Sequence, residues 1–410
     1  MNTIVIGAGP AGLMAAGSVK GGSVTALEKN EKAGKKLYIT GKGRCNVTND
    51  CLPDQAQKNV VTNPKFLFSA LNAFSPRDTM RLLEEHGMPL KTERGGRVFP
   101  VSGKASDVTA ALKKRAIENG AEIRLNAEVK DAFYDAKTQK FRIILSDGAE
   151  LNSDSLIVAT GGKSYPQTGS TGDGYRFAKA FGHTVIPPRP ALIPLILCED
   201  VKPLEGLSLE NITLTAKSGG KIYRQFGEAV FTADGISGPC VLSLSSYLSR
   251  DGFANDAELF VDLKPALTVP QLDARILREF EKYKNKRLKN ALFDLLPKSL
   301  IPYIVRYADL DGESEVNSVT KEQRAKLLDA LKNLAFKIES LGALEYGIVT
   351  GGGVSVSEIN PKTLESKLVN GLYFAGEVLD CDALTGGYNM QIALSTGFLA
   401  GKAVNVGREQ

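Results

Sequence analysis

Histidine is nearly absent from this chain of 410 residues, which contains only His86 and His183. This scarcity excludes a histidine-rich metal cage, and a serine-type catalytic triad would need one of these two isolated residues. The five cysteines are Cys45, Cys51, Cys198, Cys240 and Cys381. They include no CxxC pair and no zinc-ligand spacing, so we predict no metal site and a reducing compartment.

Long apolar runs are also missing. No window reaches 18 consecutive apolar residues, so we expect no transmembrane helix. The N-terminus passes from Met1 directly into the apolar run Ile4-Val5-Ile6 without a cationic segment. We therefore expect no signal peptide, no membrane partner and a cytoplasmic location.

The composition is that of an ordinary folded protein, with 43% hydrophobic residues, 24% charged residues and 41 glycines. The length leaves room for two to four domains, each with its own core. The 51 lysines and arginines exceed the 46 aspartates and glutamates by five. This mildly positive charge permits an acidic partner without requiring one.

Short apolar segments that each stop at a glycine loop are typical of a parallel sheet with ligand loops at its carboxyl edge. Such segments span residues 3–6, 24–28, 156–160 and 372–375. A helix is expected over residues 13–20, between the first two strands. The pattern predicts an α/β protein with a doubly wound, Rossmann-like domain.

The pattern changes in the middle of the chain, after the proline cluster at residues 187–190. Alternating polar and apolar residues over 209–223 and 257–263 predict a small antiparallel β part. From residue 269 to 340 the spacing becomes helical and includes Leu272, Ile276, Phe280, Leu327, Leu331, Leu334 and Ile338. We predict a first domain part at 1–188, a β-barrel-like insert at 189–267, a helical insert at 268–340 and the second domain part at 341–410.

A glycine-rich loop, Gly7-Ala8-Gly9-Pro10-Ala11-Gly12, follows the first strand, and Glu28 ends the next strand 21 residues after Gly7. Gly7 permits the tight turn, Gly9 lets the backbone approach a pyrophosphate, and Gly12 lets helix and strand pack closely. The helix N-terminus offers N–H groups to the phosphates. Glu28 can accept hydrogen bonds from both hydroxyls of an adenosine ribose and would repel a 2′-phosphate. We predict a dinucleotide site; a glycine-rich turn without a ligand is the alternative.

No second unit of this kind is present for a nicotinamide cofactor. The run Gly351-Gly352-Gly353 follows an apolar segment but lacks the spacing and the downstream acid. NAD(P)H, if it is used, must therefore visit the site transiently. We interpret residues 347–354 as the return of the chain into the first domain.

Further motifs carry a resemblance to a known family. They are Gly41-Lys42-Gly43-Arg44-Cys45-Asn46, Gly95-Gly96-Arg97-Val98-Phe99-Pro100, Phe231-Thr232 with Ser237-Gly238-Pro239, and Thr385-Gly386-Gly387-Tyr388-Asn389. On these motifs the chain resembles the YhiN/BaiN-type family of FAD-dependent oxidoreductases over nearly its whole length. More distantly it is similar to the fumarate reductase flavoprotein superfamily, through Ala159-Thr160-Gly161-Gly162 and Ser170-Thr171-Gly172-Asp173-Gly174. The resemblance implies a tightly held, non-covalent FAD, and we expect NAD(P)H to be its transient electron donor.

The C-terminal region contains a segment suited to the flavin half of FAD. An apolar strand ends in Gly376-Glu377, which matches the segment that holds the ribityl chain and second phosphate in such proteins. Glu377 stands where aspartate is commoner. Gly386-Gly387 then leads into a helix from about residue 389 to 400, whose N-terminus would favour an anionic reduced flavin by up to ~2 kcal/mol. A glycine-capped helix without a ligand is the alternative.

The resemblance also implies contacts to FAD that spacing alone does not give. These contacts are assigned to Lys29, Lys36, the backbone of Val129 at the adenine, Ala159, Thr160, Gly161, Tyr388, Asn389, Gln391 and Ile392.

Candidate catalytic residues lie on the loop around Gly41 and Gly43, which we expect to meet the flavin. Lys42 or Arg44 would polarise a substrate carbonyl or stabilise phosphate or reduced flavin, and Cys45 or Tyr388 would protonate a substrate carbon. The alternative is that Lys42, Arg44, Cys45 and Asn46 only hold the cofactor. Five residues separate Cys45 from Cys51, one more than in the flavin disulfide reductases, which argues against a redox disulfide.

The predicted function is FAD-dependent oxidoreduction, in which NAD(P)H reduces a C=C bond conjugated to a carbonyl and the insert forms one wall of the substrate cleft. A small, steroid-like enone and the uracil C5=C6 bond of ribosomal RNA both fit this chemistry. The cations Lys282, Lys284, Lys286, Arg287 and Lys289 lie within eight residues and favour RNA, although a solvated helix face is the alternative. A non-catalytic flavin-binding module is a further alternative, and no obligate protein partner is evident.

Overall fold

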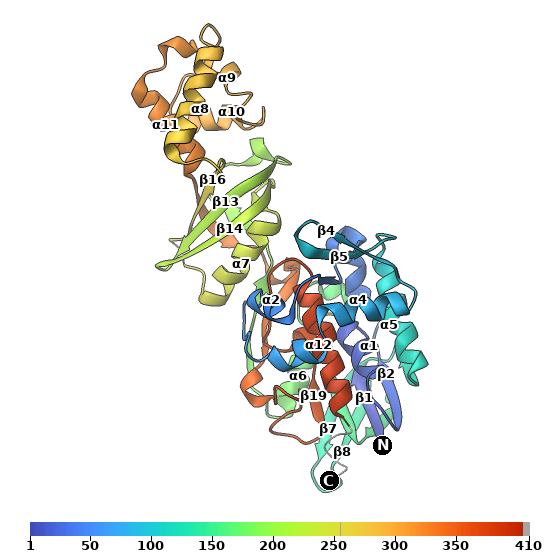
Figure 1. Cartoon of the computed structure of the whole chain (residues 1–410). Coiled ribbons are helices and arrows are strands. Elements are labelled where there is room, and N and C mark those ends of the chain that lie inside the picture. The colour runs from blue at the N-terminus through green and yellow to red at the C-terminus, as the bar shows by residue number, and fades with distance from the viewer. Residues whose placement is uncertain (255, 405–410) are drawn as a thin grey trace. The chain divides into compact units, whose positions relative to one another are not determined.

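The structure is a computed structural model that describes residues 1–254 and 256–404, without the side chains of residues 40–42. The chain divides into two units, each described by itself below. Unit 1 comprises Met1–Ala191 and Ala343–Gln410, and unit 2 comprises Leu192–Gly342. In Figure 1 the chain of unit 2 runs from green through yellow to orange. Among the described residues, no helix combines the length and apolar character needed to cross a membrane.

A five-stranded parallel sheet in the order β19-β10-β1-β2-β6 forms the centre of unit 1. Its strands are β1 (Asn2–Ile6), β2 (Ser23–Leu27), β6 (Ala121–Arg124), β10 (Ser155–Val158) and β19 (Leu372–Phe374). Every residue of β10 and β19 is buried, as expected for strands covered on both faces. The predicted parallel sheet is confirmed.

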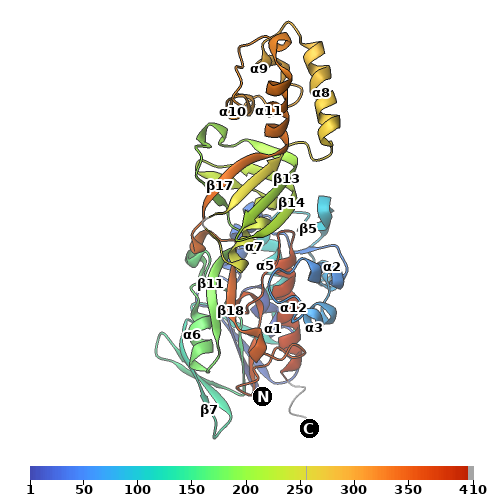
Figure 2. The same cartoon turned by 90° about the vertical axis from the view of Figure 1, so that its left-hand side faces the viewer.

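Three smaller sheets complete unit 1. One contains β7 (Val129–Asp135), β8 (Lys140–Leu145) and β9 (Glu150–Ser153), and another contains β3 (Thr48–Asn49), β5 (Arg97–Pro100) and β4 (Leu90–Glu93). The third is the antiparallel pair of β11 (Val185–Ala191) and β18 (Val349–Val354), seen side by side in Figure 2. In the sequence, β11 ends directly before unit 2 and β18 begins shortly after it.

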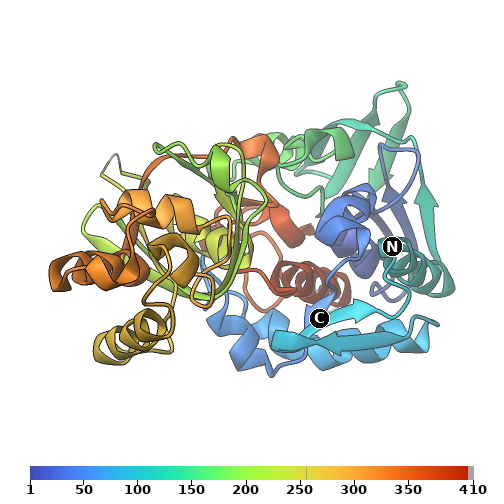
Figure 3. The ribbon, with the colours of Figure 1, turned by 90° about the horizontal axis from the view of Figure 1, so that it is seen from above.

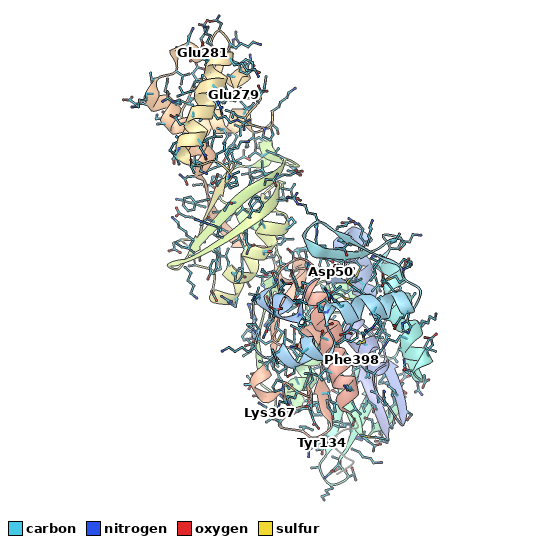
Figure 4. All side chains as sticks on the ribbon, in the orientation of Figure 1. Asp50, Tyr134, Glu279, Glu281, Lys367 and Phe398 are labelled. Atoms are coloured by element: carbon cyan, nitrogen blue, oxygen red, sulfur yellow. The ribbon has the colours of Figure 1, made fainter. Side chains whose placement is uncertain are left out.

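The helices of unit 1 are α1 (Pro10–Ala16), α2 (Pro53–Lys58), α3 (Phe68–Ala73), α4 (Pro76–Glu85), α5 (Ala105–Glu118), α6 (Asp173–Ala180) and α12 (Tyr388–Ala403). The helix expected at 13–20 begins earlier, because Pro10 occupies the first turn, where its missing N–H costs nothing. Helices α3 and α4 pack against α12 (Figure 3). Phe398 of α12, labelled in Figure 4, also stacks on Phe74, with ring centroids 4.9 Å apart according to the ring geometry.

Helices α1 and α12 pack closely because α12 carries two glycines at the contact. A Cβ on Gly397 would lie 2.3 Å from the carbonyl oxygen of Ala11, and one on Gly401 would lie 2.3 Å from that of Ala15. The two backbones therefore approach more closely than any side chain would allow. This contact aligns the helix that begins at the first glycine loop with α12, which lies near the other end of the described chain.

Unit 2 contains a closed barrel in the order β12-β15-β14-β13-β16-β17. The strands are β12 (Leu195–Leu197), β13 (Ser208–Ser218), β14 (Lys221–Phe231), β15 (Gly235–Ser237), β16 (Glu258–Asp262) and β17 (Leu334–Leu341). Its helices are α7 (Pro239–Asp251), α8 (Val269–Lys282), α9 (Leu288–Ala291), α10 (Ile301–Tyr307) and α11 (Lys321–Lys332). The expected fold class, with a β-barrel-like part and a helical part, is confirmed.

The helical assignment of residues 334–338 is wrong. Helix α11 ends before Asn333, and Leu334, Phe336 and Ile338 are buried on alternate positions of β17. This strand pairs with β16 and β12 and closes the barrel. Leu334 and Ile338 are four residues apart, a spacing that fits one face of a helix and one face of a strand equally well.

We predict that Gly397→Val lowers the free energy of unfolding by about 1–3 kcal/mol, because the added side chain meets the Ala11 carbonyl oxygen. Denaturant unfolding followed by circular dichroism measures this change. The control, Lys402→Ala, alters an exposed residue of the same helix and should shift stability by no more than about 0.5 kcal/mol. Equal stability of the two variants would contradict the close helix contact.

Candidate functional site

In the glycine loop after β1, the middle glycine has free space where a side chain would be, whereas the first and last glycines have none. A Cβ on Gly7 would lie 2.5 Å from the Ala159 carbonyl oxygen, and one on Gly12 would lie 1.8 Å from the Gly7 oxygen. At Gly9 an added Cβ would meet no heavy atom within 4 Å. Helix α1 has no side-chain cap and no acid in its first turn. The backbone at Gly9 is thus accessible to an anionic group, whereas Gly7 and Gly12 are required by the fold.

Glu28 follows β2 and lies beside this loop. Its Oε2 accepts a hydrogen bond from the Ala8 N–H at 3.0 Å, and its Oε1 accepts from the N–H and side-chain amide of Asn30 at 3.0 and 2.7 Å. The residue is 8% exposed. Each carboxylate oxygen has more than one lone pair, so Glu28 can hold the loop and still accept from ribose hydroxyls.

The loop after β10 reaches the same edge of the sheet. The Ala159 N–H donates to the Ile6 carbonyl oxygen at 2.9 Å, and Gly161 has a φ of 75°. The hydroxyl oxygens of Thr160 and Ser170 are buried without a hydrogen-bond partner. Unsatisfied buried hydroxyls next to a glycine loop are typical of a site that completes its hydrogen bonds with a ligand.

Lys36, in the loop after β2, joins this loop to the one that follows β19. Gly376 has a φ of 78°, and a Cβ there would lie 2.7 Å from that of Ala11. The Glu377 carboxylate accepts from Lys36 Nζ at 2.9 Å and from the Thr350 N–H at 2.8 Å. Lys36 also donates to Ser164 at 2.8 Å. Lys36 and Glu377, 341 positions apart in the chain, therefore lie together at this edge of the sheet.

The N-terminus of α12 lies against the loop that carries Asn46. Gly387 is its N-cap with a φ of 96°, and a Cβ there would lie 2.4 Å from the Thr48 carbonyl oxygen and 2.8 Å from Asn46 Oδ1. That Oδ1 is buried without a partner. No side chain caps α12, and its first turn carries no acid. The 16-residue helix thus presents an uncapped N-terminus beside an unsatisfied amide.

Two of the expected α12 contacts are buried in the core of unit 1. Gln391 is fully buried, and its Oε1 accepts from the hydroxyls of Thr48 and Thr79 at 2.6 and 2.8 Å. Ile392 belongs to the hydrophobic core. Asn389 exchanges two hydrogen bonds with the backbone of Ala383. These side chains hold α12 in place, whereas their backbones remain near its N-terminus.

Val129 and Lys29, two of the expected FAD contacts, lie in segments that neighbour Glu28. Val129 is the first residue of β7, and the nearby Ala127 N–H donates to the Glu28 carbonyl oxygen at 2.9 Å. Lys29 forms an ion pair with Asp173 at 2.7 Å and a hydrogen bond with Thr171 at 2.6 Å. Lys29 follows Glu28 directly in the chain, whereas Val129 is about 100 positions away in sequence and is brought near Glu28 by the hydrogen bond of Ala127.

The loop of candidate catalytic residues is held by an ion pair. Arg44 pairs with Glu93, and its guanidinium lies over the Phe99 ring, 4.3 Å from the centroid. Cys45 is 1% exposed and has a φ of 54°, a strained value for a non-glycine residue. The structure does not describe the side chains of Thr40 and Lys42. The sequence offered no signal for Glu93 as the partner of Arg44.

Tyr388 is half-buried at the start of α12, and burial raises the pKa of its phenol. Cys51 is close enough to raise that pKa further, and burial also raises the pKa of the Cys51 thiol. All five cysteines belong to the described residues, and none forms a disulfide. Among the described residues there is no cluster of side chains suited to a metal ion.

The cations of residues 282–289 are largely neutralised. Lys282 pairs with Asp294 at 2.7 Å, and Lys284 pairs with Glu281, which is labelled in Figure 4. Arg287 and Lys289 share Glu313. The whole of unit 2 contains 20 lysines and arginines and 21 aspartates and glutamates. The cluster is therefore a solvated, ion-paired surface rather than a concentration of net positive charge.

The residues at the carboxyl edge of the sheet fit FAD. The open backbone at Gly9 suits a diphosphate, Glu28 suits a ribose, and the unsatisfied oxygens of Thr160 and Asn46 accept or exchange further hydrogen bonds. Sequence reasoning missed Ser164 and Thr350, which hold Glu377 and Lys36. It also missed Arg189 with Asp380 and Asp382, although two aspartates so close to the glycine-rich start of α12 were a usable signal.

Comparisons with known proteins cover almost the whole chain. A family model described as the HI0933-like protein Rossmann domain matches residues 1–403. Ribosomal RNA dihydrouridine synthase of Haemophilus influenzae is 34% identical over 408 residues, which are 98% of both chains. The 3-dehydro-bile acid delta(4,6)-reductase of Clostridium scindens is 31% identical over 414 residues, covering 98% of this chain and 99% of the relative.

One solved structure shows the likeness of fold. The 3-ketosteroid delta1-dehydrogenase of Sterolibacterium denitrificans, in complex with 1,4-androstadiene-3,17-dione, is 14% identical and has a TM-score of 0.50. The match covers 98% of each chain. At this identity the comparison concerns the fold alone.

We predict that Gly9→Val raises the dissociation constant of FAD at least about tenfold, because the side chain fills the space that a diphosphate needs. The apoprotein should lose at most about 1 kcal/mol of stability, the cost of a poorer helix cap. Fluorescence titration of the apoprotein with FAD gives the first quantity and denaturant unfolding gives the second.

Gly12→Val is the contrasting variant, since its side chain meets the Gly7 carbonyl oxygen and should disrupt the fold itself. Unchanged FAD affinity in a folded Gly9→Val protein would argue against a diphosphate at this loop.

Proposed function

This chain belongs to the HI0933-like Rossmann-domain family and is an FAD-dependent oxidoreductase, and we propose that it uses NAD(P)H to reduce a C=C bond conjugated to a carbonyl group. The family expected from the sequence motifs is confirmed at this level. The relative named 3-dehydro-bile acid delta(4,6)-reductase supports the substrate class. NAD(P)H as the donor and a cytoplasmic location stay predictions from the sequence.

One observation carries the proposal: four loops and two helix N-termini meet at one edge of the parallel sheet. Hydrogen bonds join the loops after β1, β2, β10 and β19 to one another, and α12 begins beside them. Ligands of open parallel sheets bind at this edge, outside the carboxyl ends of the strands. A flavin dinucleotide is the ligand that matches both the glycine loop at one end and the α12 N-terminus at the other.

Bound FAD supplies hydride transfer, and the protein supplies binding, orientation and a proton. With FAD bound, the positive end of α12 would stabilise negative charge on the flavin ring system. The new C–H bond at one substrate carbon must be matched by a proton at the neighbouring carbon. Tyr388 Oη and Cys45 Sγ are the candidate donors, and the raised pKa of Tyr388 keeps its proton in place at neutral pH.

Arg44 has a positioning role in this proposal. Its ion pair with Glu93 and its place over Phe99 fix the loop that carries Cys45. A guanidinium has donors to spare after one carboxylate contact, so it can also hold a carbonyl oxygen of the substrate. We keep Lys42 as a second candidate for this role.

Uracil in ribosomal RNA is the second candidate substrate, because its C5=C6 bond is conjugated to a carbonyl. The relative from Haemophilus influenzae, named a ribosomal RNA dihydrouridine synthase, favours it. So does charge: residues outside 192–342 include 31 lysines and arginines against 25 aspartates and glutamates. Residues 29–44 alone contain six cations and one acid. In this proposal RNA phosphates contact unit 1 rather than the helical part of unit 2.

We expect anaerobic addition of NADH or NADPH to bleach the absorbance of the bound flavin, with recovery when an acceptor is added. Stopped-flow absorbance measures both half-reactions. A flavin that neither nucleotide reduces would contradict NAD(P)H as the donor, and absence of turnover with every donor and acceptor tried would favour a non-catalytic flavin module.

The two acceptor classes differ in their salt dependence. Unmodified ribosomal RNA should reoxidise the flavin with an apparent affinity that falls steeply as salt rises, whereas a steroid-like enone should show almost no slope. Whichever acceptor restores the colour at catalytic rates identifies the substrate class.

We predict that replacing the proton donor lowers kcat at least about a hundredfold while FAD occupancy and the rate of flavin reduction stay unchanged. Tyr388→Phe and Cys45→Ala test the two candidates separately, with flavin absorbance as the occupancy control. Full turnover in both variants would exclude both groups as the donor.

A further inference from the structure

Two aspartates lie in the segment that leads to the N-terminus of α12, and both are shielded from water. The Asp382 side chain is 1% exposed and that of Asp380 is 12% exposed. They follow the turn Gly376–Val378 and precede Gly386. A carboxylate in such surroundings is costly unless a cation and hydrogen bonds compensate its charge.

Arg189, from β11, is the cation that both carboxylates share. Its Nη2 lies 3.3 Å from Asp382 Oδ1 and donates to Thr62 Oγ1 at 2.9 Å, and its Nη1 lies 3.7 Å from Asp380 Oδ1. The Arg189 side chain is itself 18% exposed. Burial raises the pKa of Asp380, and Arg189 opposes this rise together with hydrogen bonds from Asn63 and the Gly352 backbone.

The segment that the arginine holds is fixed on two further sides. The Asp382 carbonyl oxygen accepts from the N–H groups of Val61 and Thr62 at 2.8 and 3.2 Å. Asn63 donates to the carbonyl oxygen of Asp380 at 2.7 Å and to its Oδ2 at 3.0 Å. The segment therefore forms part of a continuous network with residues 60–63.

The network continues into α12. Val60 and Ala383 form an antiparallel bridge, and Asn389 exchanges two hydrogen bonds with the Ala383 backbone at 2.7 and 2.9 Å. Asn389 lies in the first turn of α12. A shift of residues 380–383 would therefore move the N-terminus of that helix.

Space for the guanidinium is provided by a glycine in the paired strand. Arg189 lies opposite Gly351 in β18, and a Cβ on Gly351 would lie 3.0 Å from Arg189 Cζ. The planar guanidinium reaches Thr62, Asp380 and Asp382 at once, which a single ammonium group cannot do. The pair of strands that flanks unit 2 in the sequence thus carries the residue that fixes the α12 start.

We propose that Arg189 is a positioning residue that neutralises Asp380 and Asp382 and thereby holds the N-terminus of α12 in the place where it binds FAD. The proposal rests on the FAD site described above. Without the arginine, two neighbouring carboxylates lie uncompensated in one buried segment. They repel each other and draw in water, and the displaced segment no longer holds α12 at the cofactor.

The test measures the dissociation constant of FAD on the apoprotein by fluorescence titration. Arg189→Met should raise it at least about tenfold, and Arg189→Lys should give an intermediate value, because lysine restores charge but not the forked contact. Arg142→Met is the matched control. Arg142 has an ion pair of similar length, 3.7 Å to Glu150, but both side chains are exposed, so FAD affinity should not change.

Charge removal at the partner separates this role from simple packing. If the arginine acts by neutralisation, adding Asp382→Asn to Arg189→Met should recover most of the lost affinity, because it removes the more deeply buried charge and its repulsion of Asp380. A lost packing contact would not be restored in this way. Should Arg189→Met fail to fold, recovery of folded protein in the double variant supports the proposal, and failure of the double variant to recover overturns it.

Normal FAD affinity in folded Arg189→Met also overturns the proposal. Because affinity is measured on apoprotein without substrate, these outcomes are independent of whether the enzyme reduces an enone, a uracil or neither. A failed turnover assay would leave the FAD measurement intact.

Discussion

The close contact between α1 and α12 is the constraint on which the site depends. Two glycines of α12 face backbone carbonyl oxygens of α1, and Gly12 in α1 faces the Gly7 oxygen of its own loop. These approaches bring α1, which follows the first strand, beside α12, which is more than 370 positions further along the chain. The glycine loop and the N-terminus of α12 therefore open at one edge of the sheet, as a ligand with a central diphosphate and an electron-accepting ring at one end requires.

Around that edge, each loop is fixed by a charge from a distant segment. Lys36 pairs with Glu377, Arg44 pairs with Glu93, and Arg189 pairs with Asp380 and Asp382. These pairs lie at partly buried positions, where an uncompensated charge is costly and a loop has little freedom to move. Glycine gives the site its close approaches, and these ion pairs give it a defined geometry.

The sequence predicted the parallel sheet, the glycine loop with Glu28, and the two parts of unit 2. It failed where one spacing fits two structures: Leu334 and Ile338 belong to the strand that closes the barrel, not to a helix. It also suggested that five clustered cations in unit 2 favour RNA, whereas three carboxylates, those of Glu281, Asp294 and Glu313, pair with four of them. In both cases the deciding partner, strand β16 or Glu313, lies elsewhere in the chain.

The sequence by itself determined the dinucleotide loop, because the strand, the glycines, the helix and the acid all lie within 28 residues. Each glycine of the loop is required by contacts within this short segment or by the approach of a diphosphate. It also determined the family, through motifs spread along the chain. Only the tertiary structure decided which charges meet. Lys36 and Glu377 are 341 positions apart, and Arg189 reaches Asp382 across 193 positions. Nothing local in the chain selects such partners, because their distance in space depends on how the sheet, the helices and the paired strands β11 and β18 pack.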